Sequence, residues 1–210
     1  AGSFMCAYHG WTYDLKGALV GVPGFKEVYH EELDRENWGL IKAAQVETYK
    51  GFVFANMDPE APSFQEYLGD VGRMAVDMVA EKADRVAVVG GIQKYIIPCN
   101  WKFAADNVWD FYHSITHQSS RMSGWNRPKG RNIELRERFG RANMGFLGEY
   151  GHAFSGPEYD AESPLSQFRS ADWRSRPGAR AAFGPLVDRI PAGHPHIFPN
   201  FWVTGPGMAQ

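Results

Sequence analysis

Residues 100–117 read NWKFAADNVWDFYHSITH. If this segment is helical, Asp106, Asp110, His113 and His117 follow one another at steps of four, three and four residues and share one face. The rest of the helix surface is apolar or aromatic on nearly every side, which is typical of a buried helix. We therefore predict a buried helix that carries a stripe of two carboxylates and two imidazoles.

A buried stripe of this kind points to a metal ion, because buried charges are costly unless they are paired or bound to metal. His113 and His117 are at positions i and i+4 and can both reach one ion. Two histidines and one carboxylate form the facial triad that leaves coordination positions open on non-haem iron. The alternative is a polar stripe that faces solvent, and the aromatic flanks argue against it. Asn107 lies beside the stripe.

A second candidate metal motif occupies residues 6–11, which read CAYHGW. Cys6 and His9 can bind one metal from a single tight turn, and their sulfur and nitrogen suit zinc or an iron–sulfur cluster. The motif alone is weak, since a buried cysteine near an incidental histidine has the same pattern. A zinc finger needs a second ligand pair within about twenty residues, whereas the next histidine is His30 and the next cysteine is Cys99. We expect the missing partners upstream of the given sequence.

Composition bounds the class of protein. The 210 residues are 44% hydrophobic and 14% aromatic, enough for a core in one large or two modest domains. A net charge of −2 provides no basic footprint for nucleic acid. No apolar run approaches the ~20 residues of a membrane helix. Two cysteines favour a reducing cytoplasm over a disulfide-stapled secreted protein. The missing initial Met and the very early ligand motif suggest an internal part of a longer polypeptide.

The first part of the chain, residues 1–62, is predicted to be β-structure with turns. Its predicted elements are a hairpin about Lys16-Gly17, short strands at 39–41 and 51–55, and a linker marked by Pro59 and Pro62.

The second part, residues 63–210, is predicted to mix helices and strands. Its predicted elements are a helix over 64–82 capped by Ser63, a β-rich stretch at 86–97, a helix over 101–117, loops and strands around a cleft at 119–189, and a strand at 197–203.

Taken together, the two motifs resemble the α-subunits of Rieske non-haem iron oxygenases of the naphthalene and biphenyl dioxygenase type. That family carries C-x-H and then C-x-x-H-G-W for a 2Fe–2S cluster, followed by an N-W-K helix with a bridging Asp and two iron-binding histidines. The matching residues here are Cys6, His9, Gly10 and Trp11, then Asn100-Trp101-Lys102, Asp110, Tyr112, His113 and His117, together with the connecting stretch 49–56.

The resemblance implies an α+β chain, with a partial all-β Rieske domain followed by part of an α+β, helix-grip-like catalytic domain. Cys6 and His9 would bind the 2Fe–2S cluster, and His113 and His117 the mononuclear Fe(II). The first C-x-H pair and the iron's carboxylate ligand are expected outside residues 1–210. The intervals from Asn107 to Asp110 and from His113 to His117 are each one residue shorter than in naphthalene dioxygenase.

The resemblance also implies an activity and partners. Electrons would pass from NAD(P)H through a reductase, and often a ferredoxin, to the Rieske cluster and then to the mononuclear iron. In an α3 or α3β3 oligomer, Asp110 would link His113 of its own chain to His9 of the next, and Asn107 could orient the site. The iron would bind O2 beside an aromatic substrate and yield a cis-dihydrodiol.

Three alternatives stay open. A Rieske monooxygenase or demethylase of an aromatic acid would use the same metals, although residues 91–95 are more similar to the hydrocarbon dioxygenases. A non-catalytic Rieske electron carrier would have no use for the stripe at Asp110, His113 and His117. A structural zinc protein would need a loop of about a hundred residues between its ligand pairs.

Overall fold

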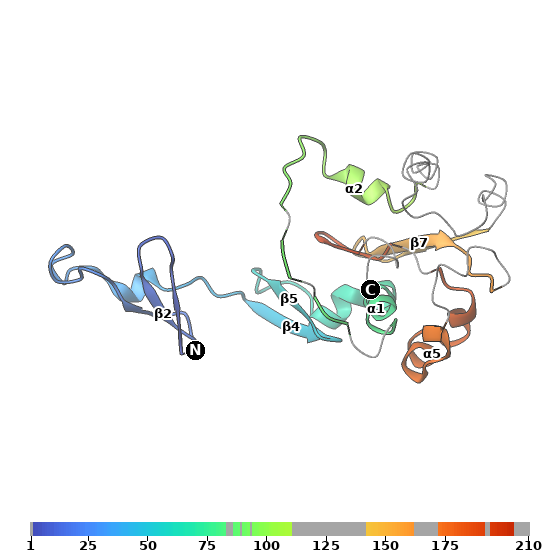
Figure 1. Ribbon diagram of the computed structural model, residues 1–210, viewed down its shortest axis with the longest axis horizontal. Coiled ribbons are helices and arrows are strands. Elements are labelled where there is room, and N and C mark those ends of the chain that lie inside the picture. The colour runs from blue at the N-terminus through green and yellow to red at the C-terminus, as the bar shows by residue number, and fades with distance from the viewer. Residues whose placement is uncertain are drawn as a thin grey trace. The chain divides into compact units, whose positions relative to one another are not determined.

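The computed structural model describes residues 2–82, 86–88, 90–92, 94–110, 142–161, 172–191 and 194–203. The chain divides into two compact units, Ala1–Ala61 and Pro62–Gln210, which are described separately (Figure 1). In the part of the chain that the structure describes, no helix has the length and apolarity needed to cross a membrane.

The first unit begins with an antiparallel sheet of three strands in chain order, β1 (Ser3–Met5), β2 (Thr12–Asp14) and β3 (Leu19–Gly21). Asp14 Oδ1 accepts hydrogen bonds of 2.9 Å from the backbone N–H groups of Lys16 and Ala18. Gly17 has a φ of +85°, which a side chain would oppose. The predicted hairpin is therefore confirmed, and its turn is held by local contacts.

A second hairpin joins β4 (Gln45–Tyr49) to β5 (Phe52–Asn56). Both central residues of its turn, Lys50 and Gly51, have positive φ, as the right-handed twist of a hairpin favours. The strand predicted at 51–55 is confirmed. The strand predicted at 39–41 is wrong, because that stretch follows the 3-10 helix η1 (Arg35–Trp38) and is not in a ladder.

The second unit begins with helix α1 (Phe64–Ala80), which confirms the predicted helix. The Ser63 hydroxyl accepts a 3.3 Å hydrogen bond from the N–H of Glu66, as a helix N-cap should. The backbone leaves helical geometry at Gly69, which kinks the helix. The buried apolar face of α1 consists of Leu68, Ala75, Val76, Met78 and Val79.

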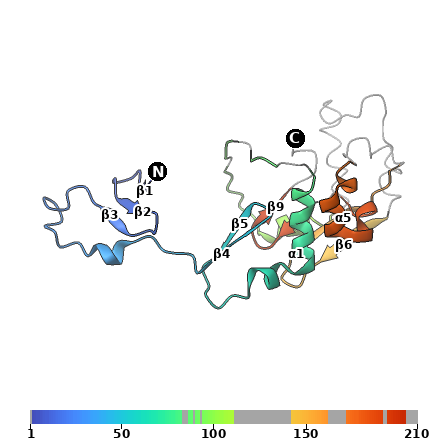
Figure 2. The same cartoon turned by 90° about the horizontal axis from the view of Figure 1, so that it is seen from below.

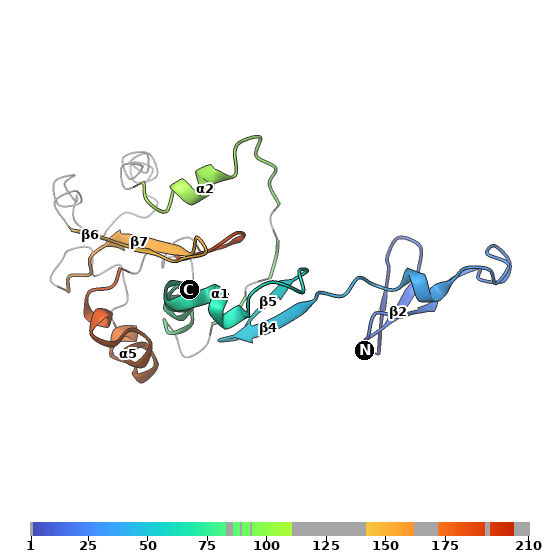
Figure 3. The same ribbon diagram turned by 180° about the vertical axis from the view of Figure 1, so that it is seen from behind.

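An antiparallel sheet of four strands in chain order forms the other layer of this unit (Figures 2 and 3). Its strands are β6 (Asn143–Leu147), β7 (Ala153–Pro157), β8 (His196–Ile197) and β9 (Phe201–Trp202). Helix α1 packs against β7 and β8. The single strand predicted at 197–203 is wrong, because residues 198–200 form a turn between β8 and β9.

A run of short helices covers residues 172–188, where we predicted loops and strands. It consists of η4 (Asp172–Ser175), α5 (Pro177–Phe183) and η5 (Gly184–Asp188). Pro177 is in the first turn of α5, and Gly184 ends it with a φ of 52°. Helix α5 packs against α1 and buries Ala179 and Phe183. A helix of seven residues is too short to show a helical period in the sequence.

Residues 86–97 also differ from the prediction, since their described part contains no strand. The segment leads to helix α2 (Lys102–Asp106). Helices and antiparallel strands thus pack together in the second unit, and the predicted α+β class is confirmed.

Candidate functional site

The Cys6–Trp11 segment forms the closed loop between β1 and β2. The Cys6 N–H donates to the Trp11 carbonyl at 2.7 Å, and the Gly10 N–H donates to the Cys6 carbonyl at 2.9 Å. Gly10 has a φ of +75°, and a Cβ there would lie 3.3 Å from Pro23 Cγ. The loop therefore depends on glycine both for its backbone angle and for the close approach of Pro23.

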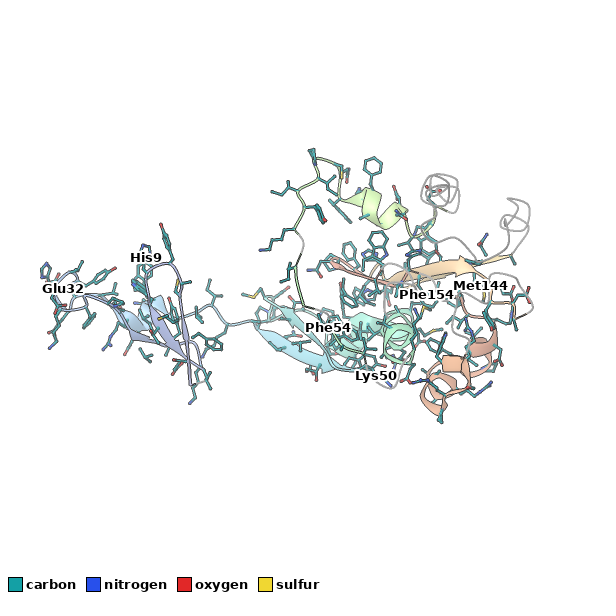
Figure 4. The ribbon with its side chains drawn as sticks, viewed as in Figure 1. His9, Glu32, Lys50, Phe54, Met144 and Phe154 are labelled. Carbon is teal, nitrogen blue, oxygen red and sulfur yellow. The ribbon has the colours of Figure 1, made fainter. Side chains whose placement is uncertain are left out.

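The loop presents a sulfur and an imidazole to the surface of the unit. Cys6 and His9 are both exposed, and neither Cys6 nor Cys99 forms a disulfide. Figure 4 shows the His9 side chain on this loop, and the Tyr8 ring lies 3.7 Å from the imidazole. Cys99 is exposed as well.

Aromatic side chains support the loop from its C-terminal end. The Trp11 ring makes edge contacts with Trp38, at a centroid distance of 5.7 Å, and with Tyr29, at 6.2 Å. These two contacts position the Trp11 ring beside the loop.

Cys6 and His9 fit half of a Rieske ligand set. In a Rieske 2Fe–2S centre, two histidines replace two of the four cysteines, so one sulfur and one imidazole are half of what is needed. Among the residues that the structure describes, no three His, Cys, Asp or Glu side chains are grouped closely enough to hold a metal ion. A Rieske cluster bound at Cys6 and His9 would therefore need two further ligands from outside this described set.

The predicted buried helix is only partly found. Helix α2 ends at Asp106, residues 107–109 form hydrogen-bonded turns, and His113 and His117 lie outside the described residues.

The prediction of burial is wrong for the described part of the stripe. Asp106 and Asp110 are exposed, Phe103 is 66% exposed, and of this segment only Val108 is buried. The contacts described for residues 107–110 include those of Val108 with β7 and of Trp109 with β6, and they leave Asp110 exposed. Burial therefore does not support a metal site at Asp106 or Asp110.

The buried face of the segment rests on β6 and β7. The Ser155 hydroxyl, on β7, donates a hydrogen bond to the Val108 carbonyl. The Trp109 ring lies against Gly145 of β6, where a Cβ would be only 2.8 Å from Trp109 Cζ3. These contacts place Asn107 and Asp110 at the two ends of a four-residue turn that is anchored through its middle.

A buried histidine that the sequence analysis missed joins three elements of the second unit. His152 Nδ1 accepts a 3.1 Å hydrogen bond from the Phe198 N–H, and Nε2 lies 2.7 Å from the Tyr67 carbonyl. Because Nδ1 is an acceptor, the proton of the neutral ring is on Nε2 and is donated to Tyr67. Tyr67 closes the circuit by donating its hydroxyl proton to the Phe198 carbonyl at 2.7 Å.

The surroundings keep His152 neutral. Burial lowers its pKa, the nearby His196 lowers the pKa further, and only the hydrogen bond to Tyr67 opposes the shift. Burial also lowers the pKa of His196, partly offset by a hydrogen bond with the Pro199 backbone. The sequence shows only a histidine after Gly151, a pattern that does not distinguish a buried core histidine from a surface one.

Comparison with known proteins identifies the class. Residues 55–210 match the family described as ring hydroxylating alpha subunit (catalytic domain). Because this match covers most of the chain, the chain belongs to that family.

Individual relatives agree with this assignment. The chain is 44% identical to the biphenyl dioxygenase subunit alpha of Paraburkholderia xenovorans (strain LB400) over 134 residues, which are 59% of this chain and 29% of that protein. It is 38% identical to a benzene 1,2-dioxygenase subunit alpha of Pseudomonas putida over 159 residues, or 73% of this chain and 34% of that protein. The chain thus spans about a third of these relatives.

A solved structure extends the likeness to both units. The naphthalene 1,2-dioxygenase with indole bound in the active site is similar with a TM-score of 0.66 and 28% identity, over 97% of this chain and 47% of that one. The resemblance to Rieske ring-hydroxylating α-subunits is confirmed. Membership of the family implies, in general, a Rieske 2Fe–2S cluster and a mononuclear iron.

Proposed function

We propose that this chain is part of the oxygenase component that adds both atoms of O2 to an aromatic ring as a cis-dihydrodiol. One observation carries the proposal. The chain contains an exposed Cys6–His9 loop followed by an anchored Asn107–Asp110 turn, in the same order as in the family. The related biphenyl and benzene dioxygenase α-subunits support this reaction class.

We assign residues 1–62 to the C-terminal part of a Rieske domain and residues 63–210 to the N-terminal part of the catalytic domain. Cys6 and His9 would provide one thiolate and one imidazole ligand of the 2Fe–2S cluster, which when bound would supply single electrons. Its histidine ligands need room at the surface to pass electrons outward, and His9 is exposed. Gly10 lets the loop backbone lie close to what the loop binds.

His113 and His117 would bind the mononuclear Fe(II), with a carboxylate from beyond residue 210 as third ligand. Asp110 would orient His113 by accepting a hydrogen bond and would accept another from His9 of a neighbouring subunit. The exposure of both Asp110 and His9 on their own chain supports such a contact between subunits of an α3 or α3β3 oligomer. Asn107, at the other end of the anchored turn, would help to orient the site.

The proposed partners follow from the same reaction. They are an aromatic substrate, O2, and a reductase with or without a ferredoxin that delivers electrons from NAD(P)H. The naphthalene 1,2-dioxygenase that matches both units has indole in its active site, and together with the related benzene 1,2-dioxygenase this supports a bicyclic or monocyclic aromatic substrate.

The reaction is tested with the full-length oxygenase, its electron donors and labelled O2. We expect a dihydrodiol in which both oxygen atoms carry the label, because dioxygenation takes both from one molecule. A product with one labelled atom would identify a monooxygenase. A demethylated product that carries no label would identify a demethylase.

The role of Asp110 is tested with Asp110→Asn, which keeps the shape of the side chain and removes its charge. We expect both metals to stay bound, as measured by cluster absorbance and iron content, and product formation to fall by about 10²-fold or more. Asp106→Asn is the matched control, since Asp106 is also exposed on the same segment. Equal loss of iron and of activity in Asp110→Asn would refute the bridging role.

A further inference from the structure

One rung of the β6–β7 ladder lies directly beneath the turn that carries Asn107 and Asp110. Gly145 and Ser155 are paired opposite each other in this ladder. Residues that face each other across an antiparallel pair have their side chains on the same side of the sheet. Gly145 contacts Trp109 and Ser155 contacts Val108, so one rung supports two consecutive residues of the turn.

The Ser155 contact is a buried polar one. Ser155 is 1% exposed and Val108 is 3% exposed, so water does not compete for their hydrogen bond. A hydroxyl and a carbonyl in such surroundings each need a partner, and each provides one for the other. Replacing the hydroxyl would leave the Val108 carbonyl without this donor.

This hydrogen bond lies where the backbone changes from α-helical to 3-10-type hydrogen bonding. The N–H groups of Val108 and Trp109 donate three residues back, to Ala105 at 3.1 Å and Asp106 at 2.9 Å, which is tighter than an α-helix. A side-chain donor on a carbonyl at this point fixes how far the segment is rotated about its axis. Asp110 is two residues further on, so its direction depends on that rotation.

The Gly145 contact restrains the same turn from the neighbouring strand. A Cβ at residue 145 would lie 2.8 Å from Trp109 Cζ3, closer than real Cβ atoms approach. The indole therefore rests on the strand backbone itself, at a distance that only glycine permits. The Ser155–Val108 hydrogen bond sets the distance of the turn from the sheet, and the contact of the Trp109 indole with Gly145 limits the tilt of the turn.

We propose that the Gly145–Ser155 rung is a positioning element that holds Asp110 and Asn107 in the geometry needed for electron transfer. The proposal rests on the proposed function, in which Asp110 joins the neighbouring subunit's cluster to the iron. Ser155 contacts Val108 and Gly145 contacts Trp109, and each acts on Asp110 through that neighbour. The expected defect is therefore in the rate of the electron-transfer step, with cofactor content unchanged.

The test compares Ser155→Ala, Ser155→Thr and Tyr67→Phe in the full-length oxygenase. Tyr67→Phe is the matched control, because it also removes one hydroxyl that donates to a backbone carbonyl in the same unit, at 2.7 Å from Phe198. Cluster absorbance, iron content, kcat, KM and the rate of cluster oxidation in a single turnover are measured for each.

We expect Ser155→Ala to slow cluster oxidation and kcat by about tenfold or more, since a small misplacement near a reacting centre can cost about 10² in rate. KM and both metal contents stay unchanged. Ser155→Thr, which keeps the hydroxyl, restores most of the rate, and Tyr67→Phe leaves cluster oxidation at the wild-type rate. Equal slowing in Ser155→Ala and Tyr67→Phe would overturn the positioning role, as would a wild-type rate in Ser155→Ala.

Gly145→Ala provides a second, independent variant if Ser155→Ala is not obtained folded. It keeps the Ser155 hydrogen bond and displaces the Trp109 ring, and we expect the same slow cluster oxidation with both metals bound. An unchanged rate would overturn the proposal. Failure of the proposed function gives a different result: the wild-type enzyme then forms no dihydrodiol. If Asp110→Asn is inactive while Ser155→Ala is as fast as the wild type, only the positioning role is refuted.

Discussion

The two units of this chain contain similar strands but differ in what those strands bury. Of the described residues in the first unit, only Leu19 is buried, although β1 contains Phe4 and Met5 and β5 contains Val53. In the second unit, helix α1 covers the sheet, and large side chains such as Phe154 and Trp173 are fully enclosed. Strand pairing alone therefore does not make a core; a second layer does.

The difference shows what each unit needs in order to be stable. The first unit is held by local turns and by the contacts around Trp11, and isolated hairpins are at best marginally stable in water. Where metal ligands come from separate segments, binding free energy becomes folding free energy. A 2Fe–2S cluster held by Cys6 and His9, as we propose, would therefore stabilise the first unit, whereas the second has its own core.

Hydrogen exchange of the 210-residue chain gives the largest expected contrast. Amides of β7 and α1 should open only with the global unfolding of their unit, and amides of β1 and β4 by local opening. With a typical domain stability of at least about 5 kcal/mol, the protection factors should differ by roughly 10³-fold or more. Similar protection in both units would show that the first one has a core of its own.

Truncating one apolar side chain in each unit should give the next largest contrast between them. Phe154, which is labelled in Figure 4, is 0% exposed. Its ring stacks on Phe146 at a centroid distance of 4.3 Å. We expect Phe154→Ala to lower the free energy of unfolding by about 3–5 kcal/mol. Val53→Ala in the first unit, where the side chain is 69% exposed, should change it by less than about 0.5 kcal/mol. Urea unfolding followed by tryptophan fluorescence measures both, and comparable losses would contradict the comparison.

Acid should destabilise the second unit in particular. The pKa of His152 is lowered by burial in the folded state, from an ordinary value of 6.5, so its contribution is fully present above that pH. Below it the unfolded chain takes up a proton that the folded chain does not, and stability falls as the pH falls. The slope is at most about 1.4 kcal/mol per pH unit for one proton.

The pH effect is measured as the midpoint of urea unfolding between about pH 7.5 and about pH 5, the range in which histidines ordinarily titrate. His152→Gln should flatten the dependence, and the control His30→Gln, at an exposed position of the first unit, should not. His196 remains in both variants and retains its own lowered pKa, so a shallow slope is expected in His152→Gln. A slope unaffected by His152→Gln would remove this histidine from the explanation.

The smallest expected effect concerns the cap of α1. Ser63→Ala removes the acceptor of the Glu66 N–H and should cost about 1 kcal/mol in the second unit. Ser3→Ala, on the exposed strand β1, is the matched control and should be nearly neutral. Thermal unfolding followed by circular dichroism distinguishes them, and an equal change in both would mean that the cap is not formed in solution.

Local signals account for the predictions that are confirmed. Gly17 and Asp14 specify their turn within five residues of chain, and Ser63 with the period of Leu68, Ala75 and Met78 specifies α1. The family resemblance likewise depended on short motifs. The assignments of Cys6, His9, Asn107, Asp110, His113 and His117 to metals or catalysis stay predictions.

Long-range contacts account for the predictions that are wrong. The apolar residues around Asp106 and Asp110 predicted a buried helix, yet burial depends on which surfaces reach the segment, and the contacts described with β6 and β7 bury only Val108 among residues 101–110. The strand predicted at 197–203 is divided by a turn at Phe198, whose N–H is bound to His152 from a distant part of the chain. Neither contact has a signature in the local sequence.

The sequence by itself determined the turns and the capped helix and supplied the candidate ligand motifs, because each depends on residues a few positions apart. Only the tertiary structure decided which of the two units has a core, that His152 is neutral and enclosed, and that Ser155 and Gly145 meet the turn before Asp110. Those properties come from residues far apart in the chain, 47 positions for Ser155 with Val108 and 46 for His152 with Phe198, whose contact energy exists only after the sheet and α1 have packed.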